Sequence, residues 1–118
     1  MTPAGVILTK LRWLEEALKR SCSVYHFHPN SHPQVEKLPP GSVCLLADYS
    51  FEGEFVGEFT VKSVQKVAGE KFAAYAERAI DVEEPFPKPG EYSWIIEFEN
   101  PIKYDRPVKL SNWPTLKY

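Results

Sequence analysis

The stretches SVCLLAD (residues 42–48) and FVGEFTV (residues 55–61) decide the fold class of this chain. In the first stretch nearly every residue is apolar, which is typical of a strand covered on both faces. In the second, apolar and polar residues alternate, which is typical of a strand with one face on the core. Residues 50–53 between them predict a hairpin turn. The two stretches therefore predict the central hairpin of a sheet.

Shorter elements precede this hairpin. GVILT (residues 5–9) is rich in β-branched residues and predicts a buried strand. In residues 10–20 apolar side chains recur at three- and four-residue steps, which predicts an amphipathic helix. VYHFH (residues 24–28) alternates with period two and predicts a strand that ends at Pro29. The chain thus begins with a strand, a helix and a second strand.

The second half of the chain continues the pattern. Residues 70–80 carry an apolar stripe that predicts a short helix, and the proline-rich residues 81–91 predict a stiff loop. Residues 92–98 alternate and predict a strand, which Asn100-Pro101 should interrupt because proline donates no hydrogen bond to a ladder. We expect residues 102–110 to continue as an edge or bent strand. These elements predict a small α+β domain with a curved or barrel-like sheet and two short helices.

Length and composition narrow the class of protein. The chain has 118 residues, so we expect one domain spanning 1–118, able to bury roughly 65% of its unfolded surface without staples. Its two cysteines, the absence of a signal-like segment and the absence of an apolar run of about 18 residues predict a reduced, cytoplasmic protein that does not enter membranes. Its sequence contains no glycine-rich phosphate loop, Cys-x-x-Cys pair or nucleophile elbow.

Charge is distributed unevenly along the chain. The net charge is −2, but residues 1–50 and 101–118 together carry nine basic and five acidic side chains, whereas residues 51–100 carry five and eleven. If the two ends of the chain meet, they form a mildly positive surface of net +4. A solvated surface of uneven charge explains the same pattern equally well.

The order of these elements resembles the ASCH family of the PUA-like superfamily, and its sister group, the EVE domains. The resemblance covers nearly the whole chain, and its most specific parts are the turn LPPG (residues 38–41) leading to VGEFTV (56–61), and the late run EFENPI (97–102) with PVKL (107–110). It implies a PUA-like small mixed β-barrel that binds RNA, modified bases or nucleotide-like ligands in a cleft beside the barrel.

One segment departs from the family pattern. Many ASCH proteins carry a Gly-x-Lys-x-x-Glu-x-Arg signature after the first helix, and the corresponding residues here are 21–28. Ser23 stands at the lysine position, and His26 and His28 stand at the acidic and arginine positions. The lysine-dependent amidohydrolase activity of small ASCH-type proteins therefore cannot be transferred to this chain, because a serine without a neighbouring base is a poor nucleophile.

The histidines are the first candidates for a site. His26 and His28 share one strand face, which we expect to be concave and opposite to Tyr25 and Phe27. With His32 nearby they have a spacing that suits one metal ion or a phosphate, but no carboxylate is fixed beside them in the sequence, so we expect neither a metal nor another cofactor. Pairing of Cys22 with His26 as a nucleophile is a further alternative, and a buried or merely exposed thiol explains Cys22 more simply.

Aromatic and basic side chains are the second group of candidates. Exposed aromatic rings beside cations make a platform for single-stranded nucleic acid, and the candidate rings are Trp13, Tyr49, Phe51, Tyr104 and Trp113. The candidate phosphate-binding cations are Arg12, Lys62, Lys103, Arg106 and Lys109. For Tyr49 and Phe51, packing within the hairpin is an equally simple explanation, and for any single cation a solvated charge is the simpler one.

Two functions remain open from the sequence. The first is a binding module for RNA or a modified nucleotide that uses Ser23, His26, His28, Tyr49, Arg12, Lys103, Arg106 and Lys109. The second is a small hydrolase of a nucleoside-like substrate with His26 or His28 as general base, assisted by Glu58 or Glu77. The missing lysine favours the first.

Overall fold

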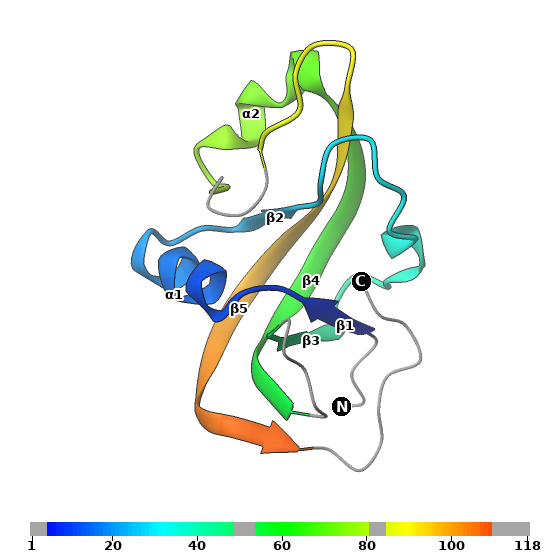
Figure 1. Cartoon of the computed structure of the whole chain (residues 1–118). Coiled ribbons are helices and arrows are strands. Elements are labelled where there is room, and N and C mark those ends of the chain that lie inside the picture. The colour runs from blue at the N-terminus through cyan, green and yellow to red at the C-terminus, as the bar shows by residue number, and fades with distance from the viewer. Residues whose placement is uncertain (1–4, 49–53, 81–84, 110–118) are drawn as a thin grey trace.

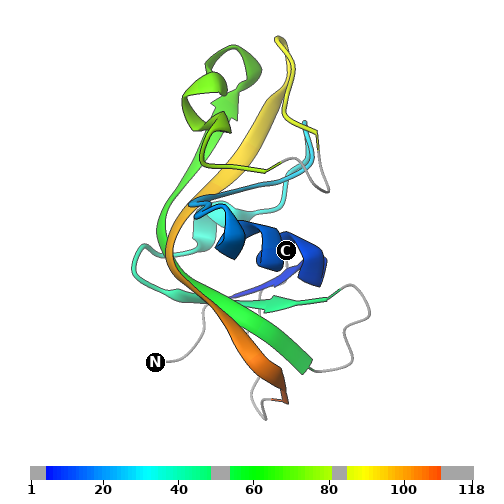
Figure 2. The ribbon, with the colours of Figure 1, turned by 90° about the vertical axis from the view of Figure 1, so that its left-hand side faces the viewer.

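The computed structural model describes residues 5–48, 54–80 and 85–109. Five strands form one mixed sheet in the order β1-β3-β4-β5-β2, so β1 and β2 are its edges (Figure 1). The strands are β1 (Gly5–Leu8), β2 (Val24–His26), β3 (Val43–Ala47), β4 (Glu54–Ala68) and β5 (Tyr92–Lys109). β1 pairs in parallel with β3, and the predicted hairpin of β3 and β4 is present. The strong curvature of β4 and β5 confirms the barrel-like α+β architecture, although hydrogen bonds do not close the sheet in the described ranges (Figure 2).

β4 and β5 form a two-stranded ribbon that runs the length of the molecule. The register pairs Ala68 with Tyr92 at one end and Glu54 with Lys109 at the other. Strand β5 continues through Asn100-Pro101, but its pairing with β4 is interrupted there as predicted, because neither residue has a partner in the register. Asn100 takes φ 53° within this register irregularity, where the missing N–H of proline costs no paired position. The ribbon therefore bends at this point, and pairing resumes on both sides of it.

Helix α1 (Leu11–Lys19) packs against the inner face of the sheet. Its first amide, that of Leu11, donates a hydrogen bond to Asp48 Oδ1 at 3.2 Å, so a carboxylate at the end of β3 caps the helix. The expectation that Trp13 is exposed is wrong: its side chain is 3% exposed. Its ring makes edge contacts with Tyr25 and Phe98, at centroid distances of 4.8 and 5.8 Å. The curved sheet offers a hollow that the indole fills.

These contacts belong to the main core, which lies between α1 and the sheet. Phe59 and Phe98 stack within it at 4.5 Å. Gly57 in β4 has no room for a side chain, because a Cβ there would meet the Ile102 carbonyl oxygen and, at 2.6 Å, a methyl carbon of Leu14. The buried members of the main core are Ile7, Trp13, Leu14, Ala17, Cys22, Tyr25, Phe27, Val35, Leu38, Cys44, Leu46, Phe59, Val61, Ile80, Ile96 and Phe98.

A second cluster lies on the other face of the ribbon, under the segment that joins β4 to β5. Its buried members are Val24, Val67, Phe72, Ala79 and Ile95. The helix predicted over 70–80 is shorter than expected: a 3-10 turn (η2, Gly69–Lys71) leads to α2 (Ala73–Ala76). A further 3-10 turn, η1 (Val35–Lys37), lies on the opposite side of the molecule from α1 in Figure 1. None of the described helices is long and apolar enough to cross a bilayer.

Candidate nucleotide-binding pocket

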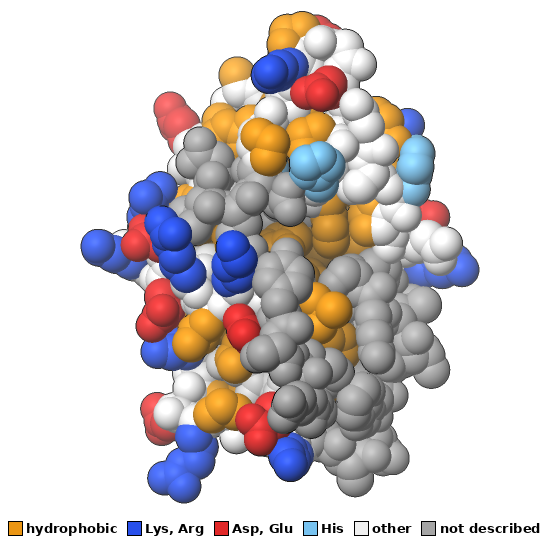
Figure 3. Space-filling model, viewed as in Figure 1, with side chains coloured by type: hydrophobic (Ala, Val, Ile, Leu, Met, Phe, Trp, Pro, Cys, Tyr) orange, Lys and Arg blue, Asp and Glu red, His pale blue; other side chains and the backbone are white. Residues whose placement is uncertain are grey.

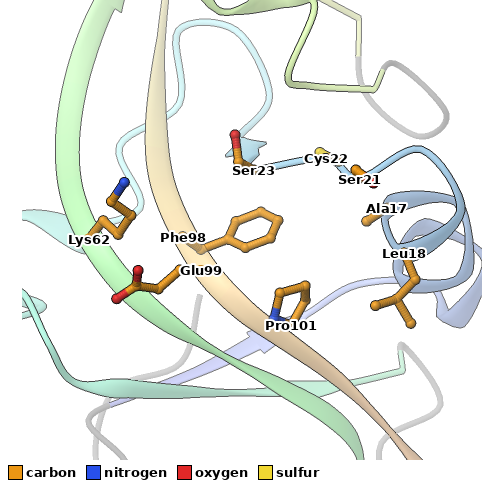
Figure 4. A pocket seen from close by; sticks show the side chains of 9 residues that line it. All are labelled: Ala17, Leu18, Ser21, Cys22, Ser23, Lys62, Phe98, Glu99 and Pro101. Atoms are coloured by element: carbon orange, nitrogen blue, oxygen red, sulfur yellow. The ribbon is translucent and has the colours of Figure 1, made fainter.

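A pocket of about 450 Å³ lies where the end of α1 meets the bend of the ribbon. Figure 4 shows the Phe98 ring projecting from β5 toward α1, with Leu18 and Pro101 beside it and Lys62 and Glu99 on the β4 side. Its volume is within the usual range for small-molecule sites. The lining residues are Ala17, Leu18, Ser21, Cys22, Ser23, Lys62, Phe98, Glu99 and Pro101.

The loop from α1 to β2 builds one wall of this pocket. Ser21 adopts φ 55°, which turns the chain sharply after the helix. The carbonyl oxygen of Arg78 then accepts hydrogen bonds from the amides of Ser23 and Val24, at 2.9 and 3.0 Å. The carbonyl of Ser23 accepts a bond from the Phe98 amide at 2.9 Å. Backbone bonds on both sides therefore fix Ser23, which the sequence placed at the family's lysine position.

Cys22 is held in the same wall and is only 6% exposed. Its Sγ donates to the carbonyl oxygens of Arg78 at 2.8 Å and Val24 at 3.2 Å. Burial raises the pKa of the thiol above its ordinary value, against smaller opposing effects of the Val24 hydrogen bond and the Arg20 charge. A thiol held in its protonated form is a poor nucleophile, so the geometry does not support the Cys22–His26 alternative.

The far wall of the pocket carries two opposite charges. Lys62 and Glu99 are both exposed and line the same pocket, yet they form no ion pair with each other or with any other residue of the described ranges. By contrast, Glu97 accepts bonds from Gln65 at 2.8 Å and Arg78 at 3.0 Å. The pocket lining thus combines apolar side chains with two serines, one cation and one anion.

The two histidines lie elsewhere. His26 points to the face opposite Tyr25, as predicted, but that face is covered and His26 is 4% exposed. Its ring packs against Phe72 and Phe86, with centroids 5.7 and 5.0 Å away. His28 follows the end of β2 and is exposed. The expected concave surface holding both imidazoles is therefore wrong, because the chain between β4 and β5 covers the first of them.

Apart from Lys62, which lines the first pocket, the predicted cations separate into two groups. Lys103 pairs with Glu15 of α1 at 3.2 Å, and with Arg106 it lines a second hollow of about 180 Å³ whose remaining lining includes Leu11. Arg12 follows Leu11 on α1 and is exposed. Lys109 lies apart, at the end of the ribbon, where it pairs with Glu54 at 3.9 Å. Figure 3 shows Lys and Arg side chains gathered over α1, with acidic side chains among them.

Several predicted residues are not among the described residues in the lining of the pocket. Tyr49, Phe51 and Trp113 lie outside the described residues, as do both ends of the chain. Tyr104 is half-buried, and its hydroxyl donates a hydrogen bond to Glu58 Oε1 at 2.8 Å. A ligand that bonds either group must therefore compete with this hydrogen bond. Within the ranges that the structure describes, no three His, Cys, Asp or Glu side chains gather as metal ligands.

Sequence reasoning missed half of the pocket. The sequence pattern presents Lys62 as one of several cations and Pro101 as a strand breaker, and it gives no sign that Leu18 and Glu99 line a pocket. The usable signal was the pair Asn100-Pro101, because a bend in a paired strand opens space beside it. The register of β4 opposite this bend, which brings Lys62 to the pocket, is not visible in the sequence.

Known structures resemble this arrangement of strands and helices. The crystal structure of ASCH from Zymomonas mobilis is 14% identical over 91% of this chain and 74% of its own, with a TM-score of 0.63. A serine-to-alanine mutant and a tyrosine-to-phenylalanine mutant of that protein match with TM-scores of 0.61 and 0.62, at 13% and 12% identity, over 91% of this chain and 75% and 76% of theirs. No protein-family model and no curated protein matches the sequence. The chain therefore has the same fold as these ASCH structures, as the sequence predicted.

Proposed function

We propose that this protein binds a nucleotide unit, of RNA or of a free modified nucleotide, in the pocket between α1 and the bend of the ribbon. The observation that carries the proposal is the lining of this pocket, which combines apolar side chains with the Lys62 ammonium, a cation that has no ion-pair partner among the described residues. A nucleotide has the matching parts, an apolar base face and an anionic phosphate. The ASCH-type fold supports the same choice.

The burial of Phe98 decides how a base binds. The Phe98 side chain is 2% exposed and its face stacks on Phe59, so only its edge reaches the pocket. A base therefore packs between Leu18 and Pro101, and the Glu99 carboxylate, which also lines the pocket, accepts hydrogen bonds from its polar edge. Lys62 neutralises a phosphate. The small contact area of one base and one solvent-exposed ion pair between Lys62 and a phosphate should give moderate or weak affinity for the nucleotide.

The hydrolase alternative has less support than binding. A general base must come within hydrogen-bond reach of the substrate, and neither proposed histidine lines the pocket: His26 is buried under Phe72 and Phe86, and His28 is exposed after the end of β2. Of the two assisting carboxylates, Glu58 accepts a hydrogen bond from Tyr104, and Glu77 does not line the pocket either. No contact of these residues favours hydrolysis over binding, so we retain only the binding function.

A titration of labelled single-stranded RNA into the protein at two salt concentrations tests this function. The wild type should bind, and its affinity should fall with salt by a log-log slope of about −0.7 for each phosphate neutralised. Lys62→Ala should weaken binding and reduce the slope by about 0.7. Lys37→Ala is the matched control, because Lys37 is an exposed lysine in η1, away from the pocket.

Equal losses in the two variants would contradict the pocket, since the effect would then come from net charge alone. No binding of RNA or of free nucleotides by the wild type would end the proposed function. Leu18→Asp provides a second, charge-based disruption at the exposed rim, where 39% of the side chain is accessible and a folding defect is not expected.

A further inference from the structure

The seam between α1 and β5 joins the pocket to the second hollow. The first pocket takes Leu18 from α1 and Pro101 from β5, and the second takes Leu11 from α1 and Tyr104 from β5. Leu11 and Leu18 are two helical turns apart on one face, and the ion pair between Glu15 and Lys103 crosses the seam between them. The two hollows are therefore consecutive sites along one edge of the helix.

The distance between the two hollows can be estimated along α1 and, separately, along β5. Seven residues of helix advance about 10 Å, and the three residues of strand from Pro101 to Tyr104 advance about 10 Å. A stacked nucleic-acid strand advances about 3.4 Å for each nucleotide. A ligand that reaches from one hollow to the other is therefore two to four nucleotides long, and a mononucleotide is too short.

The second hollow has charges suited to a phosphate. Arg106 lines it, is exposed and forms no ion pair with any residue in the described ranges. Lys103 also lines it and is shared with Glu15, while Asp105 adds a negative charge beside them. A guanidinium forms two parallel hydrogen bonds with a phosphate. A phosphate that binds Arg106 breaks no ion pair of the described residues, whereas one that binds Lys103 competes with Glu15.

We propose that the ligand is a single-stranded RNA of at least two to four nucleotides that follows the α1–β5 seam, with one nucleotide in the first pocket and a phosphate on Arg106 in the second hollow. This inference rests on the proposed function and names its ligand class. Lys62 and Arg106 anchor the two ends of the bound segment, and the Glu15–Lys103 pair lies under its middle.

A length series tests the inference. Oligouridylates of one, two, four and eight nucleotides, each with a 5′-phosphate, compete with a labelled octamer for the wild-type protein. Affinity should rise about tenfold between one and four nucleotides and change little, beyond the larger number of registers, between four and eight. Arg106→Ala should abolish this rise, whereas Lys62→Ala should weaken every length.

Two further variants sharpen the series. Lys88→Ala removes an exposed lysine outside the seam and should leave all lengths unchanged. Glu15→Gln removes a negative charge and frees Lys103, so it should strengthen tetranucleotide binding and leave mononucleotide binding unchanged. Thermal unfolding of each variant, with a midpoint equal to that of the wild type, excludes a folding defect.

The outcomes separate the two proposals. If the mononucleotide binds as tightly as the tetramer and still depends on Lys62, the seam is not used and the ligand is a free nucleotide. Affinity that continues to rise steeply beyond four nucleotides and ignores Arg106→Ala also overturns the seam. If no length binds, the proposed function fails with it.

Discussion

The main core and the second cluster bury opposite faces of the same short strand, β2, with different consequences. Tyr25 enters the main core, where it meets Trp13, whereas His26 enters the second cluster beside Phe72 and Phe86. One face is covered by a nine-residue helix and the other by a four-residue helix with its flanking turns. Alternation along a strand thus separates two sets of side chains, but it does not tell which set remains open to a ligand.

The largest expected effect compares an aromatic ring from each region. Trp13→Ala removes a ring that touches Tyr25, Phe59 and Phe98 and should cost about 3–5 kcal/mol of unfolding free energy. Phe72→Ala should cost less, about 3 kcal/mol at most, because the short helix α2 and its flanking turns can move into the cavity that the lost ring leaves. Urea denaturation of both variants measures the difference. Equal losses would show that the two regions unfold as one equally rigid core.

A middle-sized effect comes from a buried thiol of the main core. Burial raises the pKa of Cys44 from its ordinary 9.0 to about 12. The folded state thus holds this proton more tightly than the unfolded state, and the associated stability is present below pH 9 and lost as pH rises toward 12. Between pH 8 and 10.5 this loss is about 2 kcal/mol.

Urea unfolding at these two pH values, for the wild type and Cys44→Ala, measures this contribution. The alanine variant is less stable at both pH values because of the cavity, but it should lose about 2 kcal/mol less between them than the wild type does. A parallel decline of the two proteins would show that other groups, Tyr104 among them, produce the alkaline loss. The pKa of Tyr104 is also raised, by burial and then by its bond and proximity to Glu58.

The smallest expected effect is that of His26→Leu. The substitution keeps the volume of a buried side chain between Phe72 and Phe86, so the unfolding free energy should change by less than about 1.5 kcal/mol. RNA affinity should change less than twofold, because His26 does not line the pocket. Loss of binding with an unchanged melting temperature would place the imidazole in the site after all and reverse the distinction between the two faces.

The local sequence determined most of the elements. Strand β3 forms over the apolar stretch 43–47, and β4 includes the alternating stretch 55–61. Helix α1 forms where apolar residues recur with the helical period, over residues 11–18. These predictions succeed because each depends only on neighbours along the chain, through the periods of helix and strand. The resemblance of their order to the ASCH family also agreed with the solved structures.

Tertiary structure alone decided the site. The exposure of His26 depends on where a segment some fifty residues away folds back, and the pocket depends on which β4 residue faces the bend at Asn100. The carbonyl of Arg78 holds Ser23 across 55 positions of sequence. Such contacts are set by the register and curvature of paired strands, which one sequence does not encode in any local pattern. The sequence therefore determined which surfaces are apolar, and packing determined which of them a ligand can reach.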